Sequence, residues 1–474
     1  MNFQKLVWNN LLYILVQFSL PILSMAWMAH SLGSYAYGEL SWIENLSRFF
    51  ALFFSFGIPL YGHKAVQRCE NENERSTVLL TILRFHIGIV LLVSAGLGVF
   101  YFQSGQNWFF PWPFIYLISQ VFQLEWYFQG IKRYGFLIKR SLLIRTVALI
   151  LVIISIKSPD DVLLGFSIIC LTQLTIGLSN IFYLRHDINF NKLFQINNKL
   201  HIDKSLMYLS LSSIVITTYS LLDTIILKWF CDVQFLGSYF LSLRIAKMPI
   251  LVLGAIVPIS LMQLVANHQQ NSIKDYSKNL EISFKSMIIV AIPIIFFVFE
   301  NAKQIVFMMG GNSFSSGSFF LKLLIWILPM MIISNVFGYQ LLVSMDRERD
   351  FLRVSLLGLV VALVSYAILI PNFGASGVVY AVLTTEFGVA FASLLFARTV
   401  VNINNYIAYL LRWVFIFIPI IYFIHELNCL ISNVVSRLCI DFLLMVFYLL
   451  VCVKYVFKDL WFFDWFKIKK VDGC

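Results

Sequence analysis

The sequence predicts an all-α membrane protein with about 14 transmembrane helices, arranged as two pseudo-symmetric six-helix lobes around a central cavity, plus two C-terminal helices. Three observations predict this fold class. Of 474 residues, 60% are hydrophobic and 12% are charged. Apolar windows of about 20 residues recur along the chain, and segments of its first half recur in its second half. Soluble domains contain about 25% charged residues, so a soluble core cannot hold this much apolar surface.

The apolar windows give the transmembrane elements in order. They lie at residues 8–29, 40–61, 77–101, 111–129, 141–157, 162–184, 205–229, 237–264, 284–305, 318–343, 354–371, 374–397, 410–425 and 436–457. Such windows are too long and alternate too little for a membrane barrel, so helices must satisfy the backbone polar groups. The first window is too long for a signal-peptide core. The last two are separated by a weakly polar segment, which leaves open whether they form two full helices.

The basic residues predict the orientation in the membrane. Most of the 35 lysines and arginines fall in alternate loops, whereas the loops at 30–39, 102–110 and 372–373 contain none. Because cytoplasmic loops are enriched in basic residues, both termini are predicted to be cytoplasmic. The net charge of +11 therefore reflects membrane orientation, and no nucleic-acid partner is expected. All loops are short, so no soluble domain is expected on either side.

An internal repeat predicts two lobes. Leu-Gly-Ser-Tyr occurs at Leu32–Tyr35 and again at Leu236–Tyr239, each time between two apolar windows. The pattern at 141–149 recurs at 355–363. Six windows in each half give both halves the same orientation, as in parallel transporter repeats. The alternative is that apolar helices resemble one another by composition alone. The predicted organisation is an N-terminal lobe at 1–184, a cytoplasmic linker at 185–204, a C-terminal lobe at 205–397, and two additional spans with a cytoplasmic tail at 398–474.

Motifs of enzymes and cofactor sites are missing from the sequence. The seven cysteines are scattered without a Cys-x-x-Cys pair, which argues against a disulfide framework or a metal site. There is no Gly-x-x-x-x-Gly-Lys-Ser/Thr loop for nucleotide phosphates and no His-Glu-x-x-His. The sequence therefore predicts a transporter without enzyme activity, cofactor or metal.

Charged residues deep in the apolar windows are the candidate functional residues, because a charge at the bilayer centre costs about 3 kcal/mol and usually faces a cavity. The predicted substrate-binding cations are Arg48, Arg244, Lys247 and Lys322. The candidate coupling or charge-pair carboxylates are Glu44, Asp223, Glu386 and Glu125. Cations near the ends of windows are expected to reach the interface instead: Arg84, Arg145, Lys157, Lys228 and Lys303.

Two pairs within this set have different expected roles. Glu44 and Arg48 are one helical turn apart and can pair, and the alternative role of this pair is to fix helix packing. Arg244 and Lys247 have no acidic neighbour on the same helix. Two unpaired cations facing a central space predict an anionic ligand, and a phosphate suits the fork of an arginine. Hydroxyl and amide side chains along the first and seventh windows suit either helix packing or contacts with sugars.

Four segments carry a resemblance to a known family. Residues 29–38, with the first Leu-Gly-Ser-Tyr, resemble the R-x-LG-x-x-x-YG signature of polysaccharide flippases, with His30 in place of the arginine. Residues 125–133, Glu-Trp-Tyr-Phe-Gln-Gly-Ile-Lys-Arg, resemble the W-x-FQG-x-x-K/R stretch of Wzx-type O-antigen flippases. Residues 369–377 resemble the LIP-x-FG-x-x-G turn between spans 11 and 12, and residues 239–249 resemble the start of span 8 in Wzx-type and lipid II flippases.

The resemblance covers essentially the whole chain and implies the multidrug/oligosaccharidyl-lipid/polysaccharide exporter superfamily. It implies a flippase of the bacterial inner membrane that moves undecaprenyl-pyrophosphate-linked O-antigen, or a similar repeat unit, from the cytoplasmic to the periplasmic leaflet. Arg48 and Arg244 would be its cavity arginines. The implied partners are the lipid-linked oligosaccharide, inner-membrane lipids, an O-antigen polymerase and a chain-length regulator. Two alternatives are a cation-coupled drug antiporter, which would favour an anionic cavity, and a membrane-embedded polymerase, which would carry a large periplasmic loop.

Overall fold

The computed structural model describes residues 3–448, with breaks at 56–61, 63–64, 67–68, 70, 105–109, 132, 186–203, 254–256, 258–259, 262–263, 266–267, 269–272 and 413–439. Throughout these residues the regular structure is helical, which confirms the all-α class. Seven helical stretches within them are long and apolar enough to cross a membrane. Most of the two C-terminal spans predicted at 410–425 and 436–457 lies outside the described residues.

The first half of the chain begins with the longest helix. α1 (Phe3–Ser55) contains the first two predicted spans, which are joined at Gly33, whose φ of 74° breaks the helical path. Only glycine takes such a positive φ at little cost, so this residue ends one helical segment and begins the next. The other helices of this half are α3 (Glu72–Ser104), α4 (Trp112–Val121), α5 (Glu125–Gly130), α6 (Tyr134–Ser155), the 3-10 turn η2 (Pro159–Asp161) and α7 (Val162–Leu184).

The second half ends with a long helix of the same kind. α16 (Glu348–Ala397) contains predicted spans 11 and 12, joined at Gly374 with a φ of 57°. The predicted tenth span is one helical stretch, Gly317–Ser344, and it contains the π-helix η5 (Ser334–Gln340). The remaining elements are α8 (Lys204–Phe230), α9 (Val233–Leu253), α11 (Ile273–Glu300), α12 (Ala302–Gly310), η4 (Asn312–Phe314), α13 (Gly317–Leu324), α14 (Ile327–Ile333) and α15 (Leu341–Ser344).

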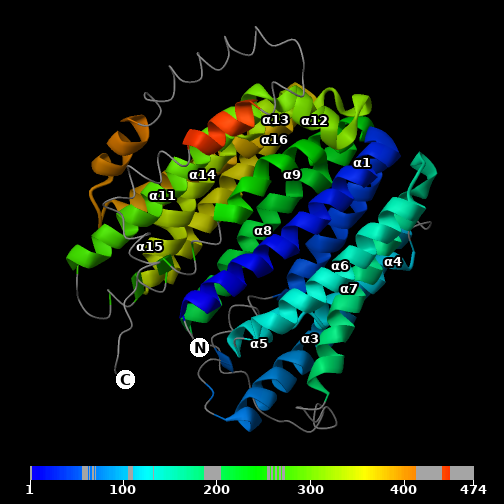
Figure 1. Ribbon diagram of the computed structural model, residues 1–474, viewed down its shortest axis with the longest axis horizontal. Helices are drawn as coiled ribbons and strands as arrows, with labels where there is room; N and C mark the ends of the chain where they lie inside the picture. Colours follow the sequence, from blue (N-terminus) through cyan, green and yellow to red (C-terminus); the bar gives the residue numbers. More distant parts are fainter. Residues whose placement is uncertain are drawn as a thin grey trace.

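α1 lies between the two sets of helices. Figure 1 shows α4, α6 and α7 on one side of α1, and α8, α9, α14 and α16 on its other side. α1 packs most extensively on α9 and α6 and also contacts α8, whereas α8 packs mainly on α16 and α4 on α7. The first and second halves of the chain therefore meet along α1, α8 and α9.

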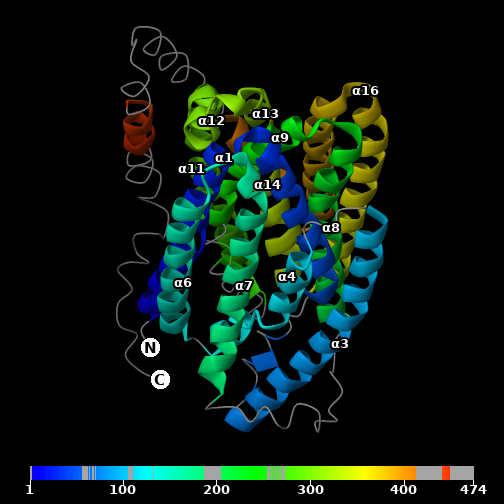
Figure 2. The same ribbon diagram turned by 90° about the vertical axis from the view of Figure 1, so that its right-hand side faces the viewer.

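The two copies of Leu-Gly-Ser-Tyr contact each other where α1 crosses α9. A Cβ atom added to Gly237 would lie 1.9 Å from the carbonyl oxygen of Ser34, and one added to Gly38 would lie 2.9 Å from the backbone nitrogen of Gly237. This contact lies at the end of the bundle that contains Gly33, where α9, α12 and α13 gather around α1 (Figure 2). We call this end of the helix bundle the Gly33 end. Small residues allow the two backbones to approach closely, as at many membrane helix crossings.

Side chains add to the contact between the halves at the Gly33 end. The ammonium of Lys228 on α8 lies 2.8 Å from a carboxylate oxygen of Glu39 on α1 and 4.0 Å from the ring centre of Trp42. The rings of Tyr37 and Phe314 meet edge to face, with centroids 5.7 Å apart. Lys228, expected to reach the interface, is instead an ion-pair partner between the two halves.

Replacing Gly237 by alanine is expected to destabilise the protein by about 1–3 kcal/mol, the usual cost of forcing an extra carbon into a packed contact. The added Cβ would meet the backbone of Ser34, which has no rotamer with which to move away. Thermal unfolding of the purified protein in detergent measures the loss. Gly88→Ala on α3 is the matched control because no atom lies within 4 Å of its added Cβ, so this variant should be at least as stable as the parent. Equal stability of the two variants would contradict the close contact.

Candidate functional site

A cavity of about 440 Å³ lies between the two halves of the chain. Both segments of α1 contribute to its wall, together with α6, α7, α8 and α9. The charged and amide side chains that line it are Glu44, Asn45, Arg48, Arg145, Gln173, Arg244 and Lys247. Four of these residues are cations and one is an anion, so the lining favours an anionic ligand. The hydroxyls of Ser24, Ser220 and Thr224 also line it.

Glu44 connects the two halves at the middle of this cavity. Its Oε1 accepts a hydrogen bond from Nη2 of Arg48, one turn further along α1, at 2.6 Å. Its Oε2 accepts one from Nη2 of Arg244 on α9, also at 2.6 Å. Arg244 donates a second, longer bond of 3.3 Å to the Tyr37 hydroxyl. The carboxylate side chain is only 6% exposed, whereas the side chains of Arg48 and Arg244 are 47% and 25% exposed toward the cavity.

The pairing of Arg244 corrects the interpretation drawn from the sequence. The Glu44–Arg48 pair follows from their spacing on one helix. Arg244 has no acidic neighbour on α9, but the fold places Glu44 beside it from 200 positions earlier in the chain. Arg244 is therefore ion-paired in this structure. No pattern along α9 could show this, because the partner comes from a different helix.

Arg145 is the charged residue of this site that the sequence analysis missed. It was expected to extend to the membrane interface, but it lines the same cavity as Arg48 and Arg244. Its Nε is buried without a hydrogen-bond partner, and among the described residues no carboxylate lies within ion-pair distance of its guanidinium. Glu125, together with the Tyr13 hydroxyl, interacts with it electrostatically from a greater distance. Of the three cavity arginines, Arg145 is thus the one without a direct acidic partner in the described part of the chain.

Lys247 lies between the cavity and a pair of buried carboxylates in the second half. It lines the cavity, and its ammonium interacts electrostatically with Asp223 on α8 and Glu386 on α16. Asp223 accepts hydrogen bonds from the Tyr239 hydroxyl and from the backbone N–H of Thr224 at 2.6 Å. Both carboxylates are buried, at 1% and 7% exposure. The fold thus gathers three of the predicted residues from three helices.

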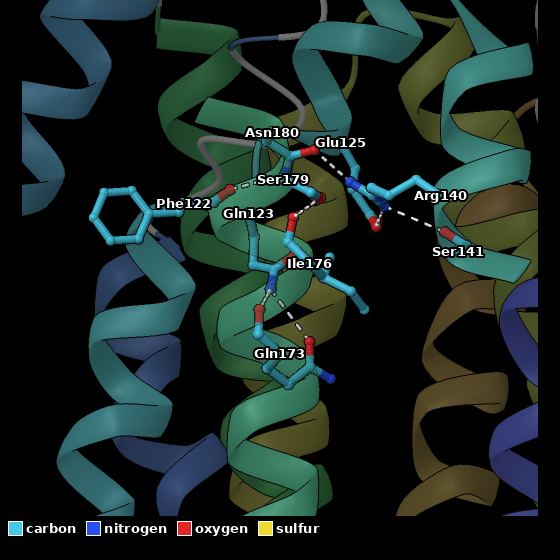
Figure 3. A network of polar contacts seen from close by, with 9 residues as sticks. All are labelled: Phe122, Gln123, Glu125, Arg140, Ser141, Gln173, Ile176, Ser179 and Asn180. Atoms are coloured by element: carbon cyan, nitrogen blue, oxygen red, sulfur yellow. Dashed lines mark hydrogen bonds and ion pairs between the residues drawn. The ribbon is translucent and has the colours of Figure 1, made fainter. Parts of the chain in front are cut away.

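Glu125 belongs to a separate network that joins α5, α6 and α7 (Figure 3). Nη2 of Arg140 lies 2.7 Å from Oε1 of Glu125, and Nη1 donates to the side-chain oxygen of Asn180. The Asn180 amide in turn donates to the carbonyl oxygen of Phe122 at 2.9 Å. The Arg140 side chain is only 3% exposed. Glu125 is therefore the partner of a buried structural arginine, and it does not line the cavity.

The Phe-Gln-Gly segment that follows Glu125 has a packing role. α5 buries Trp126, Tyr127 and Phe128, and the ring of Phe128 lies 4.7 Å from that of Phe136 on α6. Tyr183 on α7 packs on Phe136 at 4.0 Å. This aromatic cluster, together with the Arg140 network, holds the ends of three helices together.

Lys322, predicted as a substrate-binding cation, is not among the residues that line this cavity. It lies on α13, is exposed, and its ammonium is 5.2 Å from the ring centre of Phe299 on α11. Lys322 is the sixth residue of α13, near the start of the predicted tenth span, and α13 lies at the Gly33 end (Figure 2). Among the described residues, no three His, Cys, Asp or Glu side chains are placed to hold a metal ion.

Replacing Arg140 by methionine is expected to cost about 3–5 kcal/mol of stability, since it leaves Glu125 and Asn180 without their partner in a buried site. Glu125→Gln alone should also destabilise the protein, because Arg140 then loses its counter-ion. The double variant should lose less than the sum of the two single losses, since neither partner is left alone. Thermal unfolding in detergent of the four proteins measures this coupling, and strictly additive losses would contradict it.

Comparisons with known proteins agree with the membrane fold. The chain matches the family described as "Polysaccharide biosynthesis protein" over residues 5–262, more than half of its length. It is 21% identical over 390 residues to the Shigella dysenteriae protein named "Putative O-antigen transporter", which covers 80% of this chain and 96% of that protein.

Two solved structures share the fold. The lipid II flippase MurJ, in an inward closed conformation, superposes with a TM-score of 0.68 at 14% identity, over 95% of this chain and 99% of that one. A multidrug resistance MATE transporter of the MOP superfamily, in an inward-facing conformation, superposes with a TM-score of 0.63 at 12% identity, over 83% and 95% of the two chains. These matches confirm the resemblance that the sequence motifs indicated. The chain is a multi-pass membrane protein with this fold, and it belongs to the polysaccharide biosynthesis protein family.

Proposed function

We propose that this protein is a flippase for a lipid-linked polysaccharide repeat unit, which it moves from the cytoplasmic to the periplasmic leaflet of a bacterial inner membrane. The proposed substrate is an O-antigen or similar unit on undecaprenyl pyrophosphate. The observation that carries this proposal is the cavity between the two halves, where Arg48, Arg145, Arg244 and Lys247 face a space with one carboxylate in its lining. The named transporter of Shigella dysenteriae and the flippase fold support it.

The cavity chemistry suits a pyrophosphate with a glycan attached. Guanidinium groups bind phosphate oxygens through two parallel N–H donors, and such charge-assisted bonds are strong where water is scarce. Arg48 and Arg145 come from the first half and Arg244 and Lys247 from the second, so the anion would contact both halves. The amides of Asn45 and Gln173 and the neighbouring hydroxyls can bind sugar hydroxyls, while the polyprenyl chain stays in the lipid.

Alternating access is the proposed mechanism, with residues 1–184 and 205–397 as the two lobes. The Gly33 end, which the basic residues predict to be periplasmic, carries the contacts of Ser34 with Gly237 and of Glu39 with Lys228. In the proposed cycle these contacts close the cavity on the periplasmic side and separate when the lobes rock. The charged pyrophosphate and the polar glycan then avoid the lipid core, where a charge costs several kcal/mol.

Asp223 and Glu386 are the proposed coupling carboxylates. Both are buried, and among the described residues Lys247 supplies the one ammonium that interacts with them, so this group of three carries an excess negative charge when both carboxylates are ionised. A proton or a small cation bound there would neutralise the excess. Because Lys247 also lines the cavity, we propose that it links occupancy of this site to occupancy of the cavity.

The two alternatives are less well supported. A drug/cation antiporter of the same superfamily would favour an anionic cavity, whereas this lining is cationic. A polysaccharide polymerase would require a large periplasmic loop, and the predicted outer loops are short. The relatives named above are transporters and flippases rather than enzymes. A separate polymerase and a chain-length regulator are proposed to act on the flipped unit.

Deleting the gene and analysing the accumulated lipid tests the proposal directly. We expect single repeat units on a polyprenyl carrier to accumulate in the cytoplasmic leaflet, because synthesis continues without export. Accumulation of single units in the periplasmic leaflet would instead indicate a defect in polymerisation and would contradict the flippase. The sugar composition of the trapped lipid identifies the substrate.

Arg244→Ala is expected to abolish display of the surface polysaccharide, because the cavity loses a guanidinium from its second half. Arg244→Lys should restore part of the display, since it keeps the charge but not the two-donor fork. Immunoblots of the polysaccharide at matched protein levels measure both. Lys322→Gln is the control, because it removes a cation outside the cavity and should leave display unchanged. Normal display by the alanine variant at normal protein level would contradict the role of Arg244.

Arg145→Gln is expected to slow transport at least about tenfold, because a hydrogen bond to a charged group is worth about 1.5–3 kcal/mol. The rate at which lipid-linked oligosaccharide becomes accessible outside proteoliposomes measures it. Lys157→Gln removes a cation just beyond the other end of α6, outside the cavity lining, and should keep the parental rate. Equal rates for the two variants would exclude Arg145 from the binding site.

A further inference from the structure

Glu44 occupies an unusual position in a cavity whose proposed ligand is an anion. Both of its oxygens are already bonded, one to Arg48 on its own helix and one to Arg244 on α9. These are two of the guanidinium groups that the proposed function assigns to the phosphate. In this structure both guanidinium groups are therefore bound to a carboxylate of the protein itself.

The exposure of the three side chains shows how a ligand would meet this group. Glu44 is 6% exposed, Arg244 is 25% exposed and Arg48 is 47% exposed. The carboxylate is thus less exposed than the two guanidinium groups, which also line the cavity and each bond a tyrosine hydroxyl, Arg48 that of Tyr116 and Arg244 that of Tyr37. Each guanidinium has five N–H donors, so an entering anion can contact both arginines before any existing bond is broken.

The two bonds of Glu44 differ in what they connect. The bond to Arg48 lies within α1, between residues one turn apart. The bond to Arg244 joins the first half of the chain to the second. Loss of the second bond would leave Glu44 ionised and still paired with Arg48, which avoids the large cost of an isolated buried carboxylate. Loss of the bond to Arg48 would instead leave the Glu44–Arg244 bond, which connects the two halves.

We propose that Glu44 competes with the substrate's phosphate for Arg244, so that anion binding exchanges the Glu44–Arg244 ion pair for a phosphate–Arg244 contact. This inference rests on the proposed function and adds to it a step in which substrate binding breaks an ion pair between the halves. A pyrophosphate carries more negative charge than a carboxylate and offers more oxygens to a guanidinium fork. The exchange removes one connection between the halves when substrate arrives, and its reversal restores the connection when substrate leaves.

The exchange affects only an ion pair that lines the cavity. Glu39–Lys228 also joins α1 to the second half, at 2.8 Å, but neither residue lines the cavity. An anion in the cavity therefore reaches the Glu44–Arg244 pair and leaves Glu39–Lys228 in place. This makes Glu39 a natural control for Glu44, since the same substitution breaks an ion pair between the same two halves.

The test is the affinity of the purified full-length protein for inorganic pyrophosphate, measured by calorimetry in detergent. Glu44→Gln is expected to bind pyrophosphate about tenfold more tightly than the parent, because the anion no longer displaces a charge-assisted bond. Glu44→Asp should also bind more tightly, since its shorter side chain keeps the charge and the pair with Arg48 but draws the carboxylate away from Arg244. Glu39→Gln should bind with parental affinity.

The outcomes separate the exchange from the proposed function. If the parent binds pyrophosphate and both Glu44 variants bind it equally or more weakly, Glu44 only positions the arginines and the exchange is wrong, while the anion site stands. Tighter binding by Glu44→Gln with unchanged binding by Glu44→Asp means simple charge repulsion and also overturns the exchange. If the folded parent binds no pyrophosphate, the phosphate site of the proposed function fails, and the exchange fails with it.

Discussion

The carboxylate of Glu44, held between two guanidinium groups from opposite halves of the chain, is the interaction on which the central cavity depends. Arg48 and Arg244 each lie 2.6 Å from one of its oxygens. Without it, two guanidinium groups of like charge would face one cavity, where the surrounding protein screens their repulsion less than bulk water does. With it, the two arginines are oriented toward the same space, and the carboxylate itself is screened from that space by its partners.

The crossing of α1 and α9 sets the register for this interaction. Gly38 and Gly237 approach each other there more closely than any larger residue would allow. From this crossing Glu44 lies six residues further along α1 and Arg244 seven residues further along α9, which at 1.5 Å per residue places both about 9–10 Å from the crossing. The repeated Leu-Gly-Ser-Tyr thus has a physical role: the second copy supplies Gly237, and the first supplies Ser34 against which it packs.

The sequence predicted the helical membrane fold because apolar length and charge depletion are local properties. It predicted the Glu44–Arg48 ion pair for the same reason, because the two residues lie four positions apart on one helix. Arg145 was assigned to the interface because distance from the end of an apolar window does not show which face of α6 meets the other half. Lys322 was assigned to the cavity because its place in the tenth window does not show which face of α13 meets the other helices. Pairings such as Glu44–Arg244 and Glu125–Arg140 depend on tertiary contacts between helices.

α9 links the two groups of charge in the molecule. Arg244 and Lys247 lie three residues apart on it, so both face roughly the same side, yet their partners differ. Arg244 is bound to Glu44 of the first half, whereas Lys247 interacts with Asp223 and Glu386 of its own half. A rotation or shift of α9 that lengthens the first contact would also change the second, because the two residues are less than one helical turn apart. In the proposed transport cycle, α9 is therefore the element through which the substrate cavity and the buried carboxylates of the second half would be coupled.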